Sequence, residues 1–396
     1  MNALLRKLLP LGIICSAALG GCASSPTVST VPPQMFQDQW FAPATQGIDV
    51  SDVFAVSPAM REFIDKDMSH QSFRKDRREA LVDALERKSK LKIEYDSSTT
   101  RTASEAFAAR SGNCMSLVLM TAAFAKELGL SVRYRNVYVD PSWSRSNDFM
   151  FLSGHVNLTL GEDRQAVRGT NIMADGLTID FVPPDSIRNQ RAMEVGEQTI
   201  IAMFMNNRAA ENLHDGQLDN AYAWIREALR QDPKYLTGYN TLGVIYRRHG
   251  NTEAAERAFR YVLDAEPANT QAMSNMVLVL KDQHRSDEAR VLQARLDQLQ
   301  PYPPFRYFDY GIAAMKAGEY EAARGFFTKE IERSAYYHEF HFWLALANFG
   351  LGDVKQASKQ LALAMENSTT AKDHDLYAAK LAWLNAQARK QPQKMN

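Results

Sequence analysis

Cys114 is placed where a helix is expected to begin, directly after the small-residue turn Ser111-Gly112-Asn113. Residues 115–125 are apolar except for a serine and a threonine, which indicates a buried central helix. A thiol at the start of such a helix faces unpaired backbone N–H groups and the positive end of the helix dipole, and both favour the thiolate. The position suits a nucleophile. A thiol that merely packs as a small apolar side chain fits the same stretch.

Two downstream residues could complete a thiol site. The alternation in 152–160 predicts a strand with His155 opposite its apolar face, and 177–181 places Asp180 in the same way. If these strands are neighbours, His155 can serve as the base for Cys114 while Asp180 orients the imidazole. Each residue alone also fits an ordinary structural role, but the order Cys, His, Asp favours catalysis. Three other acidic residues lie in turns and compete for the orienting role: Asp163, Asp175 and Asp185.

Both helices and strands are expected around these residues. Residues 58–92 have the apolar spacing of a surface helix pair, and Thr102 to Glu105 form a capping-box pattern that opens a short helix before Cys114. A strand is expected over 131–139, followed by a loop that contains Pro141 and Trp143. The nucleophile helix would therefore lie against strands.

Four blocks resemble the signatures of transglutaminase-like domains, most closely the bacterial members joined to helical repeats. The blocks are Thr102–Phe107, Arg110–Ser116, Gly154–Asn157 and Ile179–Phe181, and the similarity covers about residues 75–185. The resemblance implies a papain-like α+β core and a triad of Cys114, His155 and Asp180.

The resemblance also implies thiol acyl chemistry on amide or peptide groups, either hydrolysis or cross-linking. The backbone N–H of Cys114 is expected in the oxyanion hole. Trp143 could wall the site or be a plain core aromatic.

The first residues of the chain predict export. A short basic segment precedes an apolar run from Leu8 to Leu19, which is too short to span a bilayer. The run ends Leu19-Gly20-Gly21-Cys22 and resembles the bacterial lipobox, so Cys22 is the expected lipidation site, with an ordinary secretory signal as the alternative. Ala23 resembles the usual residue for outer-membrane sorting. Residues 22–57 are expected to form a tether.

Cysteine and charge counts narrow the classes of function. The chain has three cysteines, so processing at Cys22 would leave Cys114 as the one free thiol of the exported protein. Lys plus Arg equals Asp plus Glu at 46 each, without basic blocks, which argues against nucleic-acid binding. The eight histidines show no metal-ligand spacing and no phosphate-binding glycine loop appears, so no metal or cofactor is expected.

The C-terminal half repeats every 34 residues. Alanines and prolines recur at this interval: Ala221, Ala255, Ala289, Ala323 and Ala357, with Pro233, Pro267 and Pro301. This pattern resembles tetratricopeptide repeats over about residues 200–370. Residues 371–396 are expected to supply a capping helix and a tail.

Such repeats bind peptides or protein segments in a concave groove. Helix position alone suggests Asn240, Arg247 and Asn275 for the groove, although solvated helix-face residues fit equally. A cluster of aromatic residues is expected in the core between repeats: Tyr302, Phe305, Tyr307, Phe308 and Tyr310.

The expected architecture is an α+β papain-like, transglutaminase-like domain followed by an all-α repeat solenoid. Its segments are 1–21 signal, 22–57 tether, 58–199 thiol domain, 200–370 repeats and 371–396 cap. The expected function is a lipid-anchored thiol hydrolase or acyltransferase on the periplasmic face of an outer membrane, with a protein partner bound by the repeats. The alternative is a catalytically silent thiol fold that serves as a protein-binding scaffold.

Overall fold

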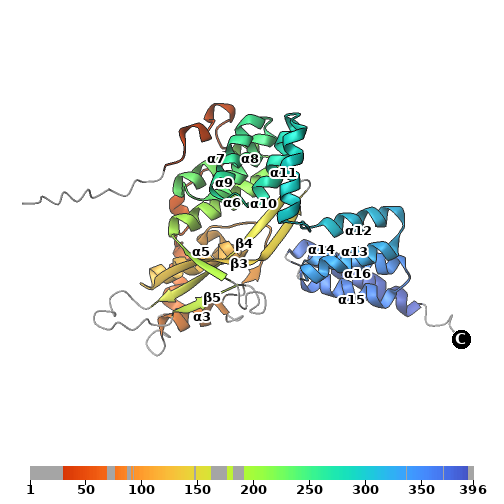
Figure 1. The fold of residues 1–396 in the computed structure, drawn as a ribbon. Helices are drawn as coiled ribbons and strands as arrows, with labels where there is room; N and C mark the ends of the chain where they lie inside the picture. Colours follow the sequence, from red (N-terminus) through yellow and green to blue (C-terminus); the bar gives the residue numbers. More distant parts are fainter. Residues whose placement is uncertain are drawn as a thin grey trace, which may run out of the picture.

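The computed structural model covers the whole chain and describes residues 30–68, 76–86, 91, 93–146, 149–161, 176–181, 191–335, 337–368 and 370–390. The expected signal and the lipidation site Cys22 lie outside these residues. Figure 1 shows a helix-and-sheet part followed by repeated helices. No helix in the described segments is long and apolar enough to cross a membrane.

The helix-and-sheet part is built around α5, which is buried on nearly all sides as the apolar run predicts. Short helices precede α5, and two-residue strands β1 and β2 pair in parallel beside its start. The bounds are η1 Pro33–Met35, η2 Asp38–Trp40, η3 Val50–Asp52, α1 Pro58–Phe63, η4 Ile64–Met68, α3 Arg77–Glu86, β1 Glu94–Tyr95, α4 Ala103–Ala109, β2 Ser111–Gly112 and α5 Cys114–Glu127.

A four-stranded antiparallel sheet packs against α5 in the order β5-β4-β3-β6. Its strands are β3 Ser131–Ser146, β4 Phe149–Gly161, β5 Leu177–Ile179 and β6 Arg191–Val195. The expected loop around Pro141 is wrong, because β3 continues to Ser146 through a register shift between Val137 and Ser142. Such an irregularity lets a strand continue past a proline that cannot donate to the ladder.

The repeats are five antiparallel helix pairs with a final helix, and no strand occurs in the described part of 200–390. The bounds are α6 Glu197–His214, α7 Leu218–Gln231, α8 Leu236–Arg248, α9 Thr252–Ala265, α10 Thr270–Asp282, α11 Ser286–Leu299, α12 Arg306–Ala317, α13 Tyr320–Arg333, α14 His338–Gly350, α15 Val354–Glu366 and α16 Ala371–Lys390. All five alanines of the 34-residue pattern are buried.

Small residues set the spacing within each pair. A Cβ on Gly243 of α8 would approach the ring of Phe259 on α9 to 2.6 Å, and Gly311 stands in the same relation to Phe327 at 2.4 Å. These separations are shorter than any real Cβ contact, so only glycine lets the paired helices approach this closely. The 34-residue period therefore reflects the close packing that recurs in each helix pair.

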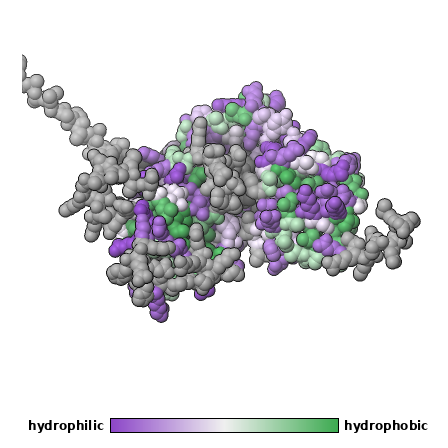
Figure 2. All heavy atoms as spheres, turned by 90° about the horizontal axis from the view of Figure 1, so that it is seen from below, coloured by the Kyte–Doolittle hydropathy of each residue, from purple (hydrophilic) through white to green (hydrophobic). Residues whose placement is uncertain are grey.

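The repeats form two blocks with separate cores. Helices α6 to α11 share one apolar core with the helix-and-sheet part, whereas the core of α12 to α16 is divided between two smaller clusters. The blocks are joined by the proline-rich segment 301–304, after which Phe305 adopts a left-handed backbone with φ of 62°. Figure 1 shows α12 to α16 set apart beyond the end of α11. On this second block, apolar and polar residues are interspersed over the face seen in Figure 2.

The described part of the expected tether packs on the repeats. Phe41 stacks on Tyr222 of α7 with ring centroids 4.0 Å apart, and the Tyr246 hydroxyl of α8 donates to the carbonyl of Met35. Asn220 of α7 accepts the backbone N–H of residue 45 at 2.9 Å. Residues 33–54 form the N-terminal arm, and residues 35–45 of it are held on the first repeats.

Candidate functional site

Cys114 is the first residue of α5 and is a partly exposed free thiol. Asn113 caps the helix, because its Oδ1 accepts the backbone N–H of Ser116 at 2.9 Å and the Ser116 hydroxyl at 2.8 Å. The cap does not engage the backbone N–H of Cys114, which lies at the front of the helix. The sequence predicted this position correctly.

The turn before Cys114 is held by tight backbone geometry. The capping box of Thr102 and Glu105 opens α4, which ends at Arg110 in a left-handed conformation with φ of 51°. Gly112 then pairs with Tyr95, and a Cβ on this glycine would lie 2.5 Å from the Cβ of Ser116. Glycine is therefore required for the chain to enter α5 at this angle.

His155 and Asp180 lie side by side. His155 is on β4, Asp180 directly follows β5, and the two strands pair antiparallel with Leu158 opposite Ile179. His155 Nε2 and Asp180 Oδ1 are 2.7 Å apart, with side-chain exposures of 6% and 11%. Because Nε2 bonds the carboxylate, Nδ1 is the ring nitrogen left for Cys114.

The pKa of His155 supports this arrangement. Burial lowers it, but hydrogen bonds with Asp180 and Cys114 and the charges of both groups raise it from 6.5 to about 9. The imidazolium form is thus stabilised between a carboxylate and a thiol. The structure brings Cys114, His155 and Asp180 together; their catalytic roles stay predictions.

Asn157 adds a second support for the carboxylate. Its Nδ2 donates to Asp180 Oδ2 at 2.8 Å from the same face of β4 as His155. Asp180 is therefore held on both oxygens, by an imidazole and by an amide. The strand alternation that marked His155 puts Asn157 on the same face.

Tyr95 belongs to the site although no sequence pattern marks it. Burial raises the pKa of its hydroxyl, as does the charge of Cys114, while a hydrogen bond from the backbone N–H of Cys114 lowers it. The Tyr95 hydroxyl therefore lies at the backbone N–H of the first residue of α5. Tyr95 reaches this place through the short pairing of β1 with β2, which sequence periodicity cannot predict from two residues.

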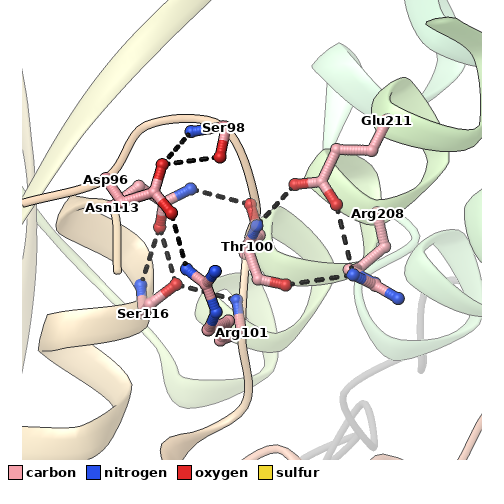
Figure 3. Close-up of polar contacts among 8 residues, drawn as sticks. All are labelled: Asp96, Ser98, Thr100, Arg101, Asn113, Ser116, Arg208 and Glu211. Carbon is pink, nitrogen blue, oxygen red and sulfur yellow. Dashed lines mark hydrogen bonds and ion pairs between the residues drawn. The ribbon is translucent and has the colours of Figure 1, made fainter. Parts of the chain in front are cut away.

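A polar network ties this region to the first repeat helix (Figure 3). The Thr100 hydroxyl accepts Asn113 Nδ2 at 2.8 Å, so the helix cap is held by the loop of residues 96–101. The backbone N–H of Thr100 donates to Glu211 Oε1 at 2.6 Å, and Arg208 Nη1 donates to the carbonyl of Thr100 and to Glu211 Oε2, each at 3.2 Å. Both Arg208 and Glu211 belong to α6.

Hydrogen bonds within the loop of residues 96–101, and one to α5, hold its conformation. Asp96 accepts the backbone N–H of Ser98 at 3.0 Å and Arg101 Nη1 at 3.2 Å, and the backbone N–H of Arg101 donates to the Ser116 hydroxyl at 2.8 Å. The thiol helix, the loop and α6 therefore form one connected unit.

Other sequence-predicted residues lie outside the described part of the chain or elsewhere in the described structure. Asp163, Asp175 and Asp185 lie outside the described residues, as does the side chain of Trp143. Asn275 Nδ2 donates to Asn240 Oδ1 at 3.0 Å, and Arg247 pairs with Asp282 at 2.6 Å.

The aromatic cluster expected in the core between repeats is buried only in part. Phe305 is buried against Phe308 and Phe340, whereas Tyr302 and Tyr310 are exposed. In the described segments, no group of three or more His, Cys, Asp or Glu could hold a metal ion.

Comparisons with known proteins concern the repeats. A family model described as tetratricopeptide repeat matches residues 240–303 and 308–371. The type IV pilus assembly protein PilF of Pseudomonas aeruginosa is 25% identical over 121 residues, which cover 30% of this chain and 48% of PilF. The TPR repeat-containing protein YvcD of Bacillus subtilis is 23% identical over 148 residues, covering 37% of this chain and 30% of YvcD.

The chain thus spans about half or less of the length of these curated relatives. Among solved structures, yeast Tom70 aligns with a TM-score of 0.35 and 13% identity over 48% of this chain and 41% of that chain. The chain carries tetratricopeptide repeats, as the 34-residue period predicted.

Proposed function

We propose that this repeat-bearing chain is an exported, lipid-anchored thiol enzyme of the transglutaminase-like type, acting on an amide or peptide bond. Cys114 is the nucleophile, His155 the base and Asp180 the orienting group. The observation that carries the proposal is the 2.7 Å contact between His155 Nε2 and Asp180 Oδ1, next to a thiol at a helix N-terminus. The repeats bind the protein partner or substrate.

The reaction follows from these positions. The Cys114 thiolate attacks the substrate carbonyl, forming a C–S bond, and His155 passes its proton to the leaving nitrogen as the C–N bond breaks. The product amine departs and leaves a thioester on Cys114. Water or a second amine then attacks the thioester carbonyl while His155 takes the proton of the nucleophile. The C–S bond breaks, the acid or the new amide leaves, and the Cys114 thiolate is restored beside the protonated His155. Water gives hydrolysis, and an amine gives transfer.

The oxyanion of each tetrahedral intermediate needs donors near Cys114. The backbone N–H of Cys114 is one, because it lies at the first residue of α5 and the Asn113 cap accepts from Ser116 instead. The Tyr95 hydroxyl is placed beside that amide and can supply the second.

The proposed segments are a signal over 1–21, a tether from Cys22, a papain-like thiol domain over 58–199, repeats over 200–370 and a cap after them. Lipidation of Cys22 would anchor the protein on the periplasmic face of an outer membrane. The name of the relative PilF, a pilus assembly protein, is compatible with a place in the envelope. Mass spectrometry of the purified protein should find an acylated N-terminus at Cys22, and an unmodified N-terminus at another residue would contradict the anchor.

A protein-binding scaffold is the second candidate, favoured by the match of the repeats to a family that is used for protein binding. The two candidates differ in the reactivity of the thiol. An acyloxymethyl ketone probe should label Cys114 in folded protein and fail with His155→Ala. A folded protein whose Cys114 does not react with the probe would favour the scaffold.

A further inference from the structure

Helix α16 occupies the place of a first helix in a further pair. It begins at Ala371, close to one 34-residue interval after α14 begins at His338. The first helices α8, α10 and α14 have 13 residues each and then turn into a second helix, whereas α16 runs on for 20 residues. The second helix of this pair is therefore not formed where the period would put it.

The side of α16 that would meet a second helix is uncovered. Gly243 and Gly311 lie against the rings of Phe259 and Phe327 in their own pairs, and both glycines are buried. Ala379 stands at the same position of the period, four intervals after Gly243, but it is exposed. The described part of the chain thus leaves this side of α16 open to solvent.

The uncovered side is apolar. Four exposed residues lie on it at the spacing of a single helix face, and together they form the α16 face: Leu376, Ala379, Trp383 and Ala386. Leu376 is 45% exposed and Trp383 is 53% exposed. Phe349 at the end of α14 extends this surface, because its ring centroid lies 5.7 Å from that of Trp383 and it is 44% exposed. A helix that caps a solenoid normally has a polar outer side, so an apolar one indicates a protein contact.

The α16 face is complementary to itself. Leu376 and Trp383 lie at equal distances, about 5 Å along the helix, on either side of a point between residues 379 and 380. A two-fold axis through this point, perpendicular to the helix, sets a second α16 antiparallel to the first and places Leu376 of each copy beside Trp383 of the other. Ala379 then lies at the crossing, where a small side chain lets the two helices approach. The second copy thus runs in the antiparallel direction that the second helix has in every pair.

Charge also favours an antiparallel second copy. Residues 371–375 of α16 include two carboxylates and one lysine, whereas the helix ends with Arg389 and Lys390. In the two-fold arrangement, the acidic start of each helix lies beside the basic end of the other. A parallel pair would bring like ends together. The chain therefore already contains the partner surface that the α16 face requires.

We propose that the α16 face binds α16 of a second copy of this chain, forming an antiparallel two-fold dimer through the second block of repeats. The contact involves one helix of about 30 Å and the neighbouring end of α14, which is small for a stable interface. We therefore expect a reversible dimer with a dissociation constant on the order of 10 µM. The proposal goes beyond the thiol function and does not rest on it, because Cys114, His155 and Asp180 all lie outside α16.

Sedimentation velocity tests the dimer with the full chain, purified in excess detergent so that acyl chains do not drive association. Wild-type protein should be mainly monomeric at about 1 µM and mainly dimeric at about 100 µM. Ala379→Glu should raise the dissociation constant about tenfold or more, because two carboxylates then meet at the two-fold axis. Ala294→Glu on the exposed side of α11 is the matched control and should leave the dissociation constant unchanged.

A charge exchange separates lost contact from lost folding. Ala379→Glu mixed with Ala379→Lys should form dimers again, because opposite charges then meet at the axis. Wild-type protein that stays monomeric at about 100 µM would overturn the proposal, even if the α16 face captures another protein. A dimer that is unaffected by Ala379→Glu would overturn it too, since the contact would then lie elsewhere.

Disulfide cross-linking in a Cys114→Ser background tests the register. Ala379→Cys should cross-link to itself, and Leu376→Cys should cross-link to Trp383→Cys when the two proteins are mixed. Leu376→Cys alone should not cross-link, because its two copies would lie about 10 Å apart along the helices, too far for a disulfide. Ala294→Cys is the exposed control and should not cross-link. Self-cross-linking of Leu376→Cys without cross-linking to Trp383→Cys would overturn the antiparallel contact.

Discussion

At the scale of single residues, each group of the candidate triad is positioned by a different support. Cys114 is placed by the Asn113 cap, His155 by its contact with Asp180, and Asp180 by a second hydrogen bond from Asn157. The imidazole is therefore oriented by a carboxylate that is itself fixed. Such a chain of supports is what a general base needs in order to act from one tautomer.

The raised pKa of His155 makes the stability of the fold depend on pH. The pKa is about 9 in the folded protein and 6.5 ordinarily, so the protonated ring stabilises the folded state. This stabilisation is complete below about pH 6.5 and is lost as the pH rises through about 9. Asp180→Asn removes a main cause of the shift, so its melting temperature should lie furthest below wild type near pH 6 and approach it near pH 10.

Differential scanning fluorimetry across this pH range measures the effect. Thr178→Val is the matched control, because Thr178 on β5 bonds Thr159 without a titrating group. Its melting temperature should differ from wild type by the same amount at every pH. If the melting temperature of Asp180→Asn lies below wild type by the same amount at every pH, the protonated His155 ring does not stabilise the fold as stated.

Sequence patterns could locate the triad but not its surroundings. A thiol before an apolar run marks Cys114, and strand alternation marks His155 and Asp180, because these signals are local. Tyr95 carries no such signal. Its position depends on which segments meet in space, and the loop that follows it is bonded to α6 across 111 residues of chain.

At the scale of elements, the loop of residues 96–101 joins the thiol helix to the first repeat. The Thr100 hydroxyl accepts a hydrogen bond from the helix cap Asn113. The backbone of Thr100 is hydrogen-bonded to Glu211 and Arg208 (Figure 3). Burial raises the pKa of Glu211 above its usual range, although hydrogen bonds with Thr100 and the charge of Arg208 lower it in part. The position of α5 thus depends on α6.

Glu211→Ala should break this connection. Thr100 is buried, so its backbone N–H would lose its partner at a cost of about 1–3 kcal/mol in the free energy of unfolding. Alkylation of Cys114 should become slower as the cap loosens. Glu227→Ala on α7 removes a carboxylate whose partners in the described part of the chain, Arg230 and Gln231, belong to the same helix, and should change neither quantity. Urea unfolding and labelling rates would measure both, and equal effects of the two variants would argue against the coupling.

Element boundaries were predictable only where periodicity is long. The helix opening at Cys114 and the strands containing His155 and Asp180 were expected at these places, whereas β6 was not, because its five residues carry no clear alternation. The full length of β3 was missed because Pro141 indicates a strand end, and the pairing with β4 overrides that local signal.

At the scale of the whole molecule, the repeats have two different surroundings. The first three pairs share a core with the helix-and-sheet part and with the N-terminal arm, while the last two pairs form their own block. The period of 34 residues predicts every helix pair but cannot show this division. Pro301 continues the 34-residue interval of the earlier prolines, although the chain changes direction after residues 301–304. The arm is docked by aromatic contacts that its composition did not indicate.

Ala255→Leu tests the packing of the first block. Ala255 is fully buried at a helix crossing, so the larger side chain should overpack it and lower the free energy of unfolding by about 1–3 kcal/mol. Ala294→Leu on the exposed face of α11 should change it by less than about 0.5 kcal/mol. Denaturant unfolding measures both, and a neutral Ala255→Leu would contradict the tight crossing.

The most direct test of the account is the rate at which iodoacetamide alkylates Cys114 near pH 6. An ordinary thiol, with a pKa of about 8.5, is almost fully protonated at this pH and reacts slowly. Folded wild-type protein should react about tenfold or more faster than urea-unfolded protein, because in the folded protein the Cys114 thiol lies at a helix start and hydrogen-bonds His155. His155→Ala, shown to be folded by circular dichroism, should lose this advantage. A rate that equals that of the unfolded chain and does not change in His155→Ala would contradict the proposed thiol enzyme and favour the protein-binding scaffold.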